Sequence, residues 1–304
     1  MTSGLKVLQQ ELADAFGESR VRVGEPLARH CNWKVGGPAD VFLLVRTTGE
    51  LIQALRLAGR HCQPVTVLGF GANALVSDRG IRGLVILNRA ERIVFHQDCL
   101  VEADSGTNLA VLAKRAAERG VGGLEFLIGI PGTVGAAVAG NAGTRERWIE
   151  TVLERVRVLG TNGEEYDLVV SDLAYAYRDS RLKRTGEVVI TAWLRGQPAE
   201  RLDIERKMDE LLRLRKNQPP GPSAGSVFKN PPGDFAGRLI EQCGLKGYQV
   251  GGAKISEMHA NFIVNTGSAS AEDIKALIEL AKAEVERRFG VRLEEEVRYL
   301  GDWL

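Results

Sequence analysis

Residues 122–143 read GGLEFLIGIPGTVGAAVAGNAG, a segment made almost entirely of small and apolar residues. Glycine is needed where the backbone approaches another backbone or a ligand closely, or where φ is positive. The centre of the segment is small enough for close approach to a bulky, flat ligand, and its candidate contact residues are Pro131, Gly132, Thr133, Gly135 and Ala136. Taken alone, the segment is equally compatible with tight turns packed against neighbouring backbone.

The chain has two glycine-rich loops, and residues 131–136 form the second. The first lies earlier, directly after the apolar run 65–68, and consists of Gly69, Phe70, Gly71, Ala72 and Asn73. It matches the dinucleotide fingerprint G-x-G-x-x-A, which binds a pyrophosphate only where a helix follows. Here the chain reaches a turn at 78–80 and then another apolar strand, so a Rossmann fold is excluded. Successive N–H groups of such a loop can still bind an anion. Two such loops in adjacent modules favour a large phosphate-containing cofactor.

The composition is that of a globular protein without a dominant charge. The 304 residues carry 40 basic and 39 acidic side chains, so no overall field points to nucleic acid or to a membrane surface as a partner. The four cysteines are far apart and predict neither a disulfide framework nor a metal site. The N-terminal residues lack the apolar core of a signal peptide, and no apolar run is long enough to span a membrane, so we expect a cytoplasmic protein.

Hydrophobic periodicity predicts three α/β modules, at 1–88, 89–198 and 199–304. The first contains strands at 39–45, 65–68 and 84–87 and a helix capped by Thr48. The second contains a strand at 99–103, a helix capped near Thr107, a hairpin of 152–159 with 165–170, and a strand at 188–194. The third contains a helix through Arg215, a strand at 262–264, a helix at 271–289 and a terminal strand at 291–300.

Several ordered motifs resemble one family. The loops lie in LGFGANALVSD and IGIPGTVGAAVAGNAG, which are similar to the paired FAD-binding segments of the UDP-N-acetylenolpyruvoylglucosamine reductase (MurB) family. Further matches follow the family's order along nearly the whole chain: NWKVGGPAD at 32–40, YRDS at 177–180, AGSVFKNP at 224–231 and LEEEVR at 293–298. Several separate motifs in order are more specific than any one of them.

The resemblance implies an α+β fold of the PCMH type, with two α/β subdomains that hold FAD and a C-terminal α/β domain that binds substrate. It implies that UDP-N-acetylglucosamine enolpyruvate is reduced to UDP-N-acetylmuramate with NADPH, in peptidoglycan precursor synthesis. The sequence holds no separate nicotinamide-binding motif, which is explained if NADPH and substrate use the same cleft in turn. We expect a monomer.

Reduction of an enol ether conjugated to a carboxylate needs a hydride, a group that stabilises the enolate, and a proton donor. Flavin supplies the hydride, because no side chain can. Arg178 is a suitable stabiliser, since its guanidinium stays charged and can fork onto a carboxylate. The resemblance assigns the proton to Ser226, which from the residues alone would be an ordinary loop serine.

The resemblance also selects Glu296 as a group that stabilises the enolate. In an extended strand, Glu295 would share a buried face with Leu293 and Val297, and Glu296 would lie on the opposite face. The strand alternation and the family resemblance agree if that opposite face lines the cleft. A solvated acidic run remains the alternative.

Candidate contacts to the substrate are Tyr177, Lys216, Lys229, Asn230 and Asn261. Lys216 and Lys229 can bind a diphosphate as point charges, and the resemblance places family binding positions at Lys216 and Asn230. Tyr175 is a weaker candidate, and His259 is expected to be structural.

Two other functions remain open from the sequence. One is a flavin oxidase or dehydrogenase that acts on another small molecule. The AGSVFKNP motif and the terminal glutamate argue against it, because they point to the UDP-sugar substrate. The chain is also compatible with a nucleotide-binding module without catalysis, whose function would survive replacement of Arg178. A hydrolase is disfavoured because no G-x-S-x-G surrounds Ser226.

Overall fold

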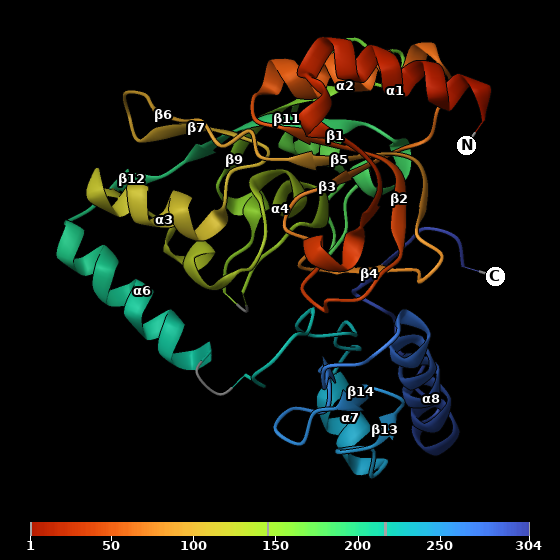
Figure 1. Ribbon diagram of the computed structural model, residues 1–304. Helices are drawn as coiled ribbons and strands as arrows, with labels where there is room; N and C mark the ends of the chain where they lie inside the picture. The colour runs from red at the N-terminus through yellow and green to blue at the C-terminus, as the bar shows by residue number, and fades with distance from the viewer. Residues whose placement is uncertain (1, 145, 216–217, 304) are drawn as a thin grey trace. The chain divides into compact units, whose positions relative to one another are not determined.

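The computed structural model describes residues 2–144, 146–215 and 218–303 (Figure 1). The chain forms two compact units, each assembled from segments that are distant in the sequence. Unit 1 comprises Met1–Arg22, Val41–Gly69 and Gly83–Lys216, and unit 2 comprises Val23–Asp40, Phe70–Arg82 and Asn217–Leu304. The division into modules 1–88, 89–198 and 199–304 stays a prediction, and the compact units group the residues differently.

The first sheet has the order β1–β2–β5–β3, and β3 runs parallel to β5. The bounds are β1 Val21–Pro26, β2 Pro38–Val45, β3 Val65–Leu68 and β5 Ile81–Asn88, which confirms the strands predicted in this region. The chain passes between the units within β1, β2 and β5. In unit 1, α1 (Ser3–Phe16) and α2 (Thr48–Arg60) bury leucines such as Leu8 and Leu51 in one core with residues of β2 and β5.

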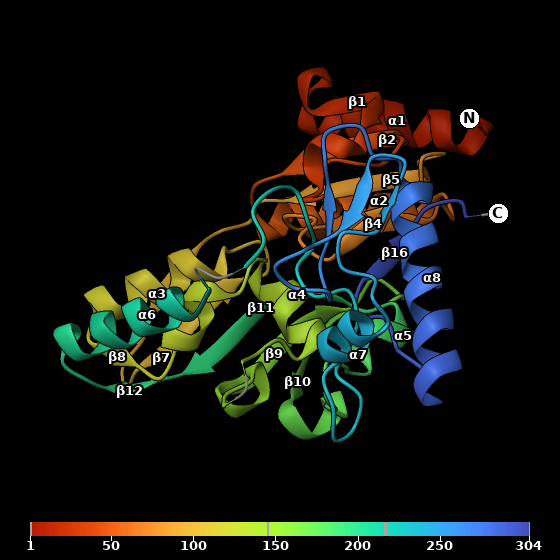
Figure 2. The ribbon, with the colours of Figure 1, turned by 90° about the horizontal axis from the view of Figure 1, so that it is seen from below.

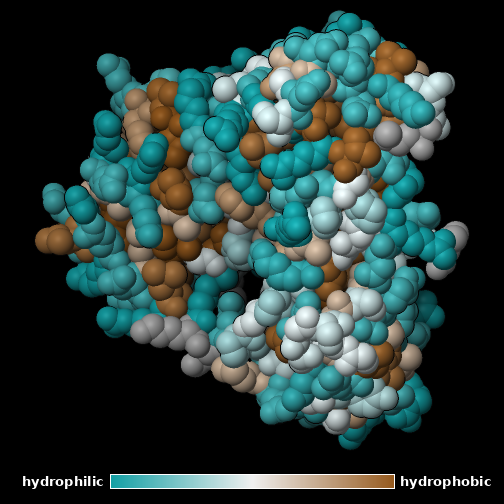
Figure 3. All heavy atoms as spheres, viewed as in Figure 1, coloured by the Kyte–Doolittle hydropathy of each residue, from teal (hydrophilic) through white to brown (hydrophobic). Residues whose placement is uncertain are grey.

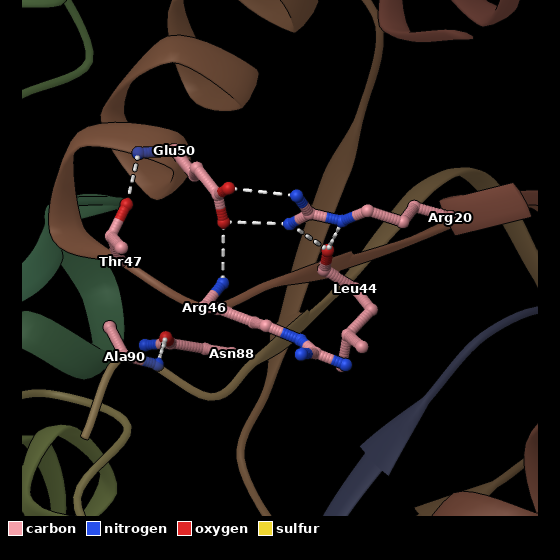
Figure 4. A network of polar contacts seen from close by, with 7 residues as sticks. All are labelled: Arg20, Leu44, Arg46, Thr47, Glu50, Asn88 and Ala90. Carbon is pink, nitrogen blue, oxygen red and sulfur yellow. Dashed lines mark hydrogen bonds and ion pairs between the residues drawn. The ribbon is translucent and has the colours of Figure 1, made fainter. Parts of the chain in front are cut away.

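A polar network fixes the start of α2 (Figure 4). Thr47, rather than the predicted Thr48, is the N-cap, and its hydroxyl accepts a hydrogen bond of 3.2 Å from the backbone N–H of Glu50. The Glu50 carboxylate accepts bonds from Arg20 at 2.7 and 2.8 Å and from the Arg46 N–H at 2.6 Å. These donors, with Arg20 first, lower the pKa of Glu50 to about 2. A cap one residue earlier is within the usual uncertainty of helix ends.

The second sheet of unit 1 is antiparallel, in the order β10–β9–β11–β7–β6. The bounds are β6 Ile93–Phe95, β7 Leu100–Asp104, β9 Leu153–Leu159, β10 Glu165–Val169 and β11 Val188–Arg195, and the predicted hairpin of β9 and β10 is confirmed. Helix α3 (Leu109–Glu118) is capped by the Asn108 side chain. Helix α6 (Arg201–Arg215) lies alongside α3 (Figures 1 and 2).

Short elements complete unit 1. A two-stranded pair joins β8 (Val121–Gly122) to β12 (Gln197–Pro198). Two short helices are α4 (Val134–Gly140) and α5 (Leu182–Thr185). The 3₁₀ turns of unit 1 are η1 (Glu18–Arg20), η3 (Glu125–Gly129), η4 (Ile149–Thr151) and η5 (Val170–Leu173).

Unit 2 is built around helix α8, Ala271–Phe289, as predicted. Ser270 and Asp273 form a reciprocal capping box, and Gly290 ends the helix at φ +67°. Asp78 adds a second cap, because its carboxylate accepts bonds of 2.9 and 3.1 Å from the N–H groups of Ala271 and Glu272. The elements around α8 are η2 (Leu27–His30), β4 (Ala74–Val76), α7 (Ala236–Gln242), β13 (Gln249–Val250), β14 (Ala253–Ile255), β15 (Ile263–Asn265) and β16 (Arg298–Leu300).

The predicted terminal strand at 291–300 is wrong in length, because only β16 is regular and it runs parallel to β4. Residues 294–296 instead make scattered backbone bonds to Val227 and Lys229. These bonds satisfy backbone N–H and C=O groups without forming a continuous β-ladder. The alternation of apolar residues therefore overestimates the length of the strand.

The surface of unit 1 carries exposed leucines on α6. Leu202 and Leu214 are each 78% exposed, while Ile204 and Met208 on the inner face are buried. Hydrophobic and hydrophilic residues alternate over the region of α3 and α6 in Figure 3. In the part of the chain described, no helix is long and apolar enough to cross a membrane.

Candidate functional site

The second glycine loop, 131–136, leads directly into helix α4 (Val134–Gly140), where the sequence predicts a loop. Thr133 caps α4, and its hydroxyl accepts a bond of 3.4 Å from the Ala136 N–H. The Gly135 N–H donates to the Ser105 carbonyl at 2.8 Å, and a Cβ at Gly135 would lie 2.9 Å from the Ser105 Cβ. Position 135 therefore has no room for a side chain.

The two glycine loops meet within unit 1. A Cβ at Gly69 would lie 2.7 Å from both the Cγ2 and the Oγ1 of Thr133. Arg89 donates a bond of 2.9 Å to the Gly69 carbonyl, and burial lowers the pKa of Arg89. The family resemblance predicts that both loops belong to one site. The structure brings Gly69 and Thr133 together, in agreement with that prediction for these two residues.

The rest of the first loop belongs to unit 2. Gly71 has φ +57°, and a Cβ there would lie 2.2 Å from the His30 carbonyl oxygen. The Gly71 carbonyl in turn accepts a bond of 3.1 Å from the Asn32 N–H. The loop therefore crosses the start of the NWKVGGPAD motif at a point where only glycine fits. Phe70 is half-buried, Ala72 is buried and Asn73 is exposed.

These segments fit a flavin nucleotide. Pro131 and Ala136 are exposed, and a Cβ at Gly132 would meet no described atom within 4 Å, so this surface of unit 1 is both small and open. The Thr107 hydroxyl is buried without a hydrogen-bond partner among the described residues, next to the backbone bond from Val134 N–H to the Thr107 carbonyl. A flat ligand with polar edges matches such a surface, because buried polar atoms ordinarily have partners.

Arg178 occupies a strained turn. The backbone groups of Ala176 and Asp179 exchange two bonds of 3.1 Å, and Arg178 between them has φ +58°. Its Nη2 donates to the Gly143 carbonyl at 3.0 Å, and its Cζ lies 5.5 Å from the centre of the Tyr177 ring. Positive φ at a non-glycine residue is costly and is concentrated at functional sites.

Three side-chain hydrogen bonds connect this turn to α4 and to Asn141, the C-cap of α4. The Tyr175 hydroxyl donates to the Val138 carbonyl at 3.0 Å, and the buried Ser180 hydroxyl donates to the Ala139 carbonyl at 2.7 Å. The Asn141 amide donates to the Ala176 carbonyl at 3.2 Å. Burial raises the pKa of Tyr175, so its hydroxyl remains a donor. Tyr175 therefore positions the turn, a role that its place in the sequence did not reveal.

In unit 2, three predicted site segments are joined by hydrogen bonds. Ser226 is half-buried and precedes Val227, whose carbonyl accepts a bond of 2.8 Å from the Glu296 N–H. The Asn73 amide donates to the Glu296 carbonyl at 2.9 Å. The first glycine loop, the serine segment and the terminal glutamate segment thus converge, although they are far apart in the sequence.

The structure distinguishes the three consecutive glutamates by their partners. Glu294 forms an ion pair with Lys229, and Glu295 accepts a bond of 2.8 Å from Lys282 on α8. Leu293 and Val297 are buried in the same core as α8, as alternation predicts. Of the three glutamates, Glu296 is the one whose backbone is bonded to both the serine segment and the glycine loop.

Other predicted substrate contacts act as scaffold in this structure. Asn261 is buried, and its amide exchanges bonds of 2.9 and 2.8 Å with the backbone N–H and carbonyl of Phe228. Asn230 accepts a bond of 3.1 Å from the Ala236 N–H at the start of α7. His259 accepts a bond of 3.2 Å from the Asn261 N–H, which is the structural role expected. Substrate contacts by Asn230 and Asn261 stay predictions, and Lys216 lies outside the described residues.

Comparison with known proteins gives consistent matches along the chain. Residues 216–300 match the family described as UDP-N-acetylenolpyruvoylglucosamine reductase, C-terminal domain, and residues 39–168 match an FAD binding domain. The chain is 46% identical to UDP-N-acetylenolpyruvoylglucosamine reductase 2 of Symbiobacterium thermophilum, over 93% of this chain and 92% of the relative. It is 39% identical to the reductase of Caldanaerobacter subterraneus subsp. tengcongensis, over 98% and 99% of the two chains. The crystal structure of MurB from Thermus caldophilus matches with a TM-score of 0.79 and 38% identity, over 92% of this chain and 98% of that one.

Proposed function

Because the chain belongs to the UDP-N-acetylenolpyruvoylglucosamine reductase family, a group of FAD-dependent oxidoreductases of peptidoglycan synthesis, we propose that it uses NADPH to reduce UDP-N-acetylglucosamine enolpyruvate to UDP-N-acetylmuramate. The observation that supports this most directly is the convergence of the Ser226, Glu296 and Asn73 segments within unit 2. In the net reaction one hydride and one proton add across the carbon–carbon double bond, and NADPH becomes NADP⁺.

The bound flavin supplies the hydride chemistry, and the residues at the two glycine loops would hold it. Gly69 and the segment 131–136 in unit 1, and Phe70, Gly71, Ala72 and Asn73 in unit 2, would form its contacts. Close backbone approach at Gly69, Gly71 and Gly135 leaves these loops without side chains that would fill the space.

Ser226 is the proposed proton donor. A serine hydroxyl is a weak acid, so it can protonate only a strongly basic carbon in a site that excludes water. The half-buried position of Ser226 suits that requirement. The backbone just after it is held by the bonds from Val227 to Asn261 and from Glu296 to Val227.

Arg178 and Glu296 are proposed to stabilise the enolate. The Arg178 guanidinium stays charged and can fork onto the substrate carboxylate, where negative charge develops. Glu296 would hold the reacting group through its carboxyl.

Several further proposals follow from the family and the sequence. NADPH and the nucleotide substrate would occupy one site in turn, since no second dinucleotide motif is present. Lys216, Lys229 and Tyr177 would contact the substrate. We also propose that the protein acts in the cytoplasm as a monomer.

The visible spectrum of the purified protein tests the function. Under anaerobic conditions, NADPH should bleach the flavin band, and UDP-N-acetylglucosamine enolpyruvate should restore it. If the band bleaches with NADPH but does not return, the flavin assignment stands and the enolpyruvyl nucleotide is ruled out as the oxidant. A protein that takes up no flavin when FAD is supplied would overturn the proposal.

Paired substitutions test the assignment among the glutamates. Glu296→Gln should slow flavin reoxidation by the enolpyruvyl nucleotide about 100-fold, because it replaces the carboxyl group that is proposed to contact the enolate with an amide. Glu295→Gln is the matched control and should change this rate by less than about threefold, since exposed and partly exposed pairs contribute little. Stopped-flow absorbance gives both rates. A larger loss in Glu295→Gln would reverse the assignment.

A further inference from the structure

The segment that follows Ser226 is held on one side by a single buried residue, Asn261. The Asn261 carbonyl accepts a hydrogen bond of 2.8 Å from the Val227 N–H. Its side-chain amide accepts a bond of 2.9 Å from the Phe228 N–H and donates one of 2.8 Å to the Phe228 carbonyl. Asn261 is only 3% exposed, so water does not compete for these bonds. One asparagine thus supplies the bonds that a neighbouring strand would otherwise make.

The other side of the same segment is bonded to the terminal glutamate segment. The Val227 carbonyl accepts a bond of 2.8 Å from the Glu296 N–H. The backbone N–H and C=O groups of both Val227 and Phe228 are therefore engaged, either by Asn261 or by Glu296. Backbone bonds consequently fix the position of Ser226 relative to Glu296.

Asn261 is itself held in place by His259. The Asn261 N–H donates to the His259 Nδ1 at 3.2 Å, and a Cβ at Gly237 would lie 2.9 Å from the His259 Cε1. The imidazole ring therefore has little room to turn away from Asn261. Burial lowers the pKa of His259, which favours the neutral ring that can accept this bond.

We propose that Asn261 is a positioning residue for proton transfer, which fixes the Ser226 hydroxyl relative to Glu296 and does not contact the substrate. Both polar atoms of its side chain are bonded to Phe228, so this role replaces the substrate contact expected from the sequence. Without the amide, the buried Phe228 N–H and carbonyl would lose their partners, and the segment would shift to find others. The inference rests on the proposed function, in which Ser226 donates the proton.

Two variants of the full-length, FAD-loaded protein test this role beside a matched control. Asn261→Ala removes the amide, and Asn261→Asp replaces it with a carboxyl group that offers both a donor and an acceptor only when protonated. Asn265→Ala is the control, because Asn265 is a second buried asparagine of unit 2. Its amide donates to the Trp33 carbonyl at 2.8 Å and accepts from the Gly267 N–H at 2.8 Å, away from the Ser226 segment. Thermal unfolding reports the stability lost in each variant.

Anaerobic stopped-flow absorbance measures the two half-reactions, and calorimetry measures the Kd of UDP-N-acetylmuramate. We expect Asn261→Ala to slow reoxidation by the enolpyruvyl nucleotide about 10- to 100-fold, because a small misplacement of a reacting group is costly. Flavin reduction by NADPH and the Kd should each stay within about threefold of wild type, since neither depends on proton transfer from Ser226. Asn265→Ala should unfold at a similarly lowered temperature and reoxidise within about threefold of wild type.

The Asn261→Asp variant adds a readout that loss of stability alone would not produce. Its reoxidation rate, divided by the wild-type rate at the same pH, should fall as the pH rises. Deprotonation removes the donor to the Phe228 carbonyl and leaves a buried charge, and burial raises the pKa at which this happens. Division by the wild-type rate removes the titration of His259. If Asn261→Ala does not fold, this ratio decides the question, and a ratio that does not change with pH overturns the proposal.

A double variant with Ser226→Ala separates positioning from general damage. If Asn261 acts through Ser226, Asn261→Ala should add less than about threefold to the slowing that Ser226→Ala causes. Fully additive slowing, an equal loss in Asn265→Ala, or wild-type reoxidation by folded Asn261→Ala would overturn the proposal. A weakened Kd with an unchanged rate would also overturn it and would make Asn261 a substrate contact. If wild-type flavin is not reoxidised by the enolpyruvyl nucleotide, the proposed function itself fails, before any variant is compared.

Discussion

Replacing Ser226 with alanine should leave flavin reduction by NADPH unchanged and slow flavin reoxidation by the enolpyruvyl nucleotide about 1,000-fold or more. A positioned general acid contributes about 10²–10⁴-fold, and a serine that protonates carbon has no equivalent neighbour that replaces it. The substitution removes one hydroxyl from a half-buried position, and no hydrogen bond from that hydroxyl to the described residues holds the segment in place. Anaerobic stopped-flow absorbance separates the two half-reactions.

Ser223→Ala is the control for this experiment, because Ser223 is half-buried in the same loop and has no proposed role. It should react as wild type in both half-reactions. In D₂O, the wild-type reoxidation should show a solvent isotope effect if proton transfer limits it. Equal slowing of both half-reactions in Ser226→Ala would indicate a disturbed flavin site and would count against a proton-donor role.

Gly71→Ala should abolish flavin binding. The new Cβ would lie 2.2 Å from the His30 carbonyl oxygen and 2.8 Å from the Cys31 Cα, both of which are backbone atoms that cannot rotate away. The position also has φ +57°, which costs a non-glycine residue roughly 1–2 kcal/mol. The loop must move to accept the methyl group, and Asn73 and its bond to the Glu296 carbonyl would move with it. The ratio of flavin to protein absorbance after purification with added FAD measures the effect.

Gly59→Ala provides the same chemical change at a site without these constraints. Gly59 lies in α2, and a Cβ there would meet no described atom within 4 Å. That variant should bind FAD normally and unfold at a similar or higher temperature, since alanine favours a helix over glycine. Normal flavin content in folded Gly71→Ala would show that this loop does not contact the cofactor.

The sequence was most informative where a local pattern and its capping residues agree. Helix 271–289 was predicted to its ends because Ser270, Asp273 and Gly290 supply the start and stop signals. The hairpin of β9 and β10 followed from alternation around a glycine turn. The α+β FAD-binding fold was predicted by resemblance and is confirmed by the family matches and by the Thermus caldophilus structure.

The remaining features depend on contacts between distant segments, which periodicity does not encode. The terminal strand was overestimated because residues 294–296 bond to 227–229 in a scattered pattern. The role of Tyr175 depends on the Val138 carbonyl, and that of Asn261 depends on Phe228.

The interleaved path of the chain has a consequence for its synthesis. Trp33 and Leu75 are fully buried, and their core partners include Ile274, Leu277 and Ile278 of α8. A ribosome makes these two residues long before α8, so unit 2 cannot complete its core until the chain is nearly finished. Until then both apolar side chains remain exposed in a nascent chain that lacks their partners. Such exposed apolar surface makes the chain prone to aggregation. The segments around Trp33 and Leu75 are therefore the places where a chaperone would be expected to act during translation.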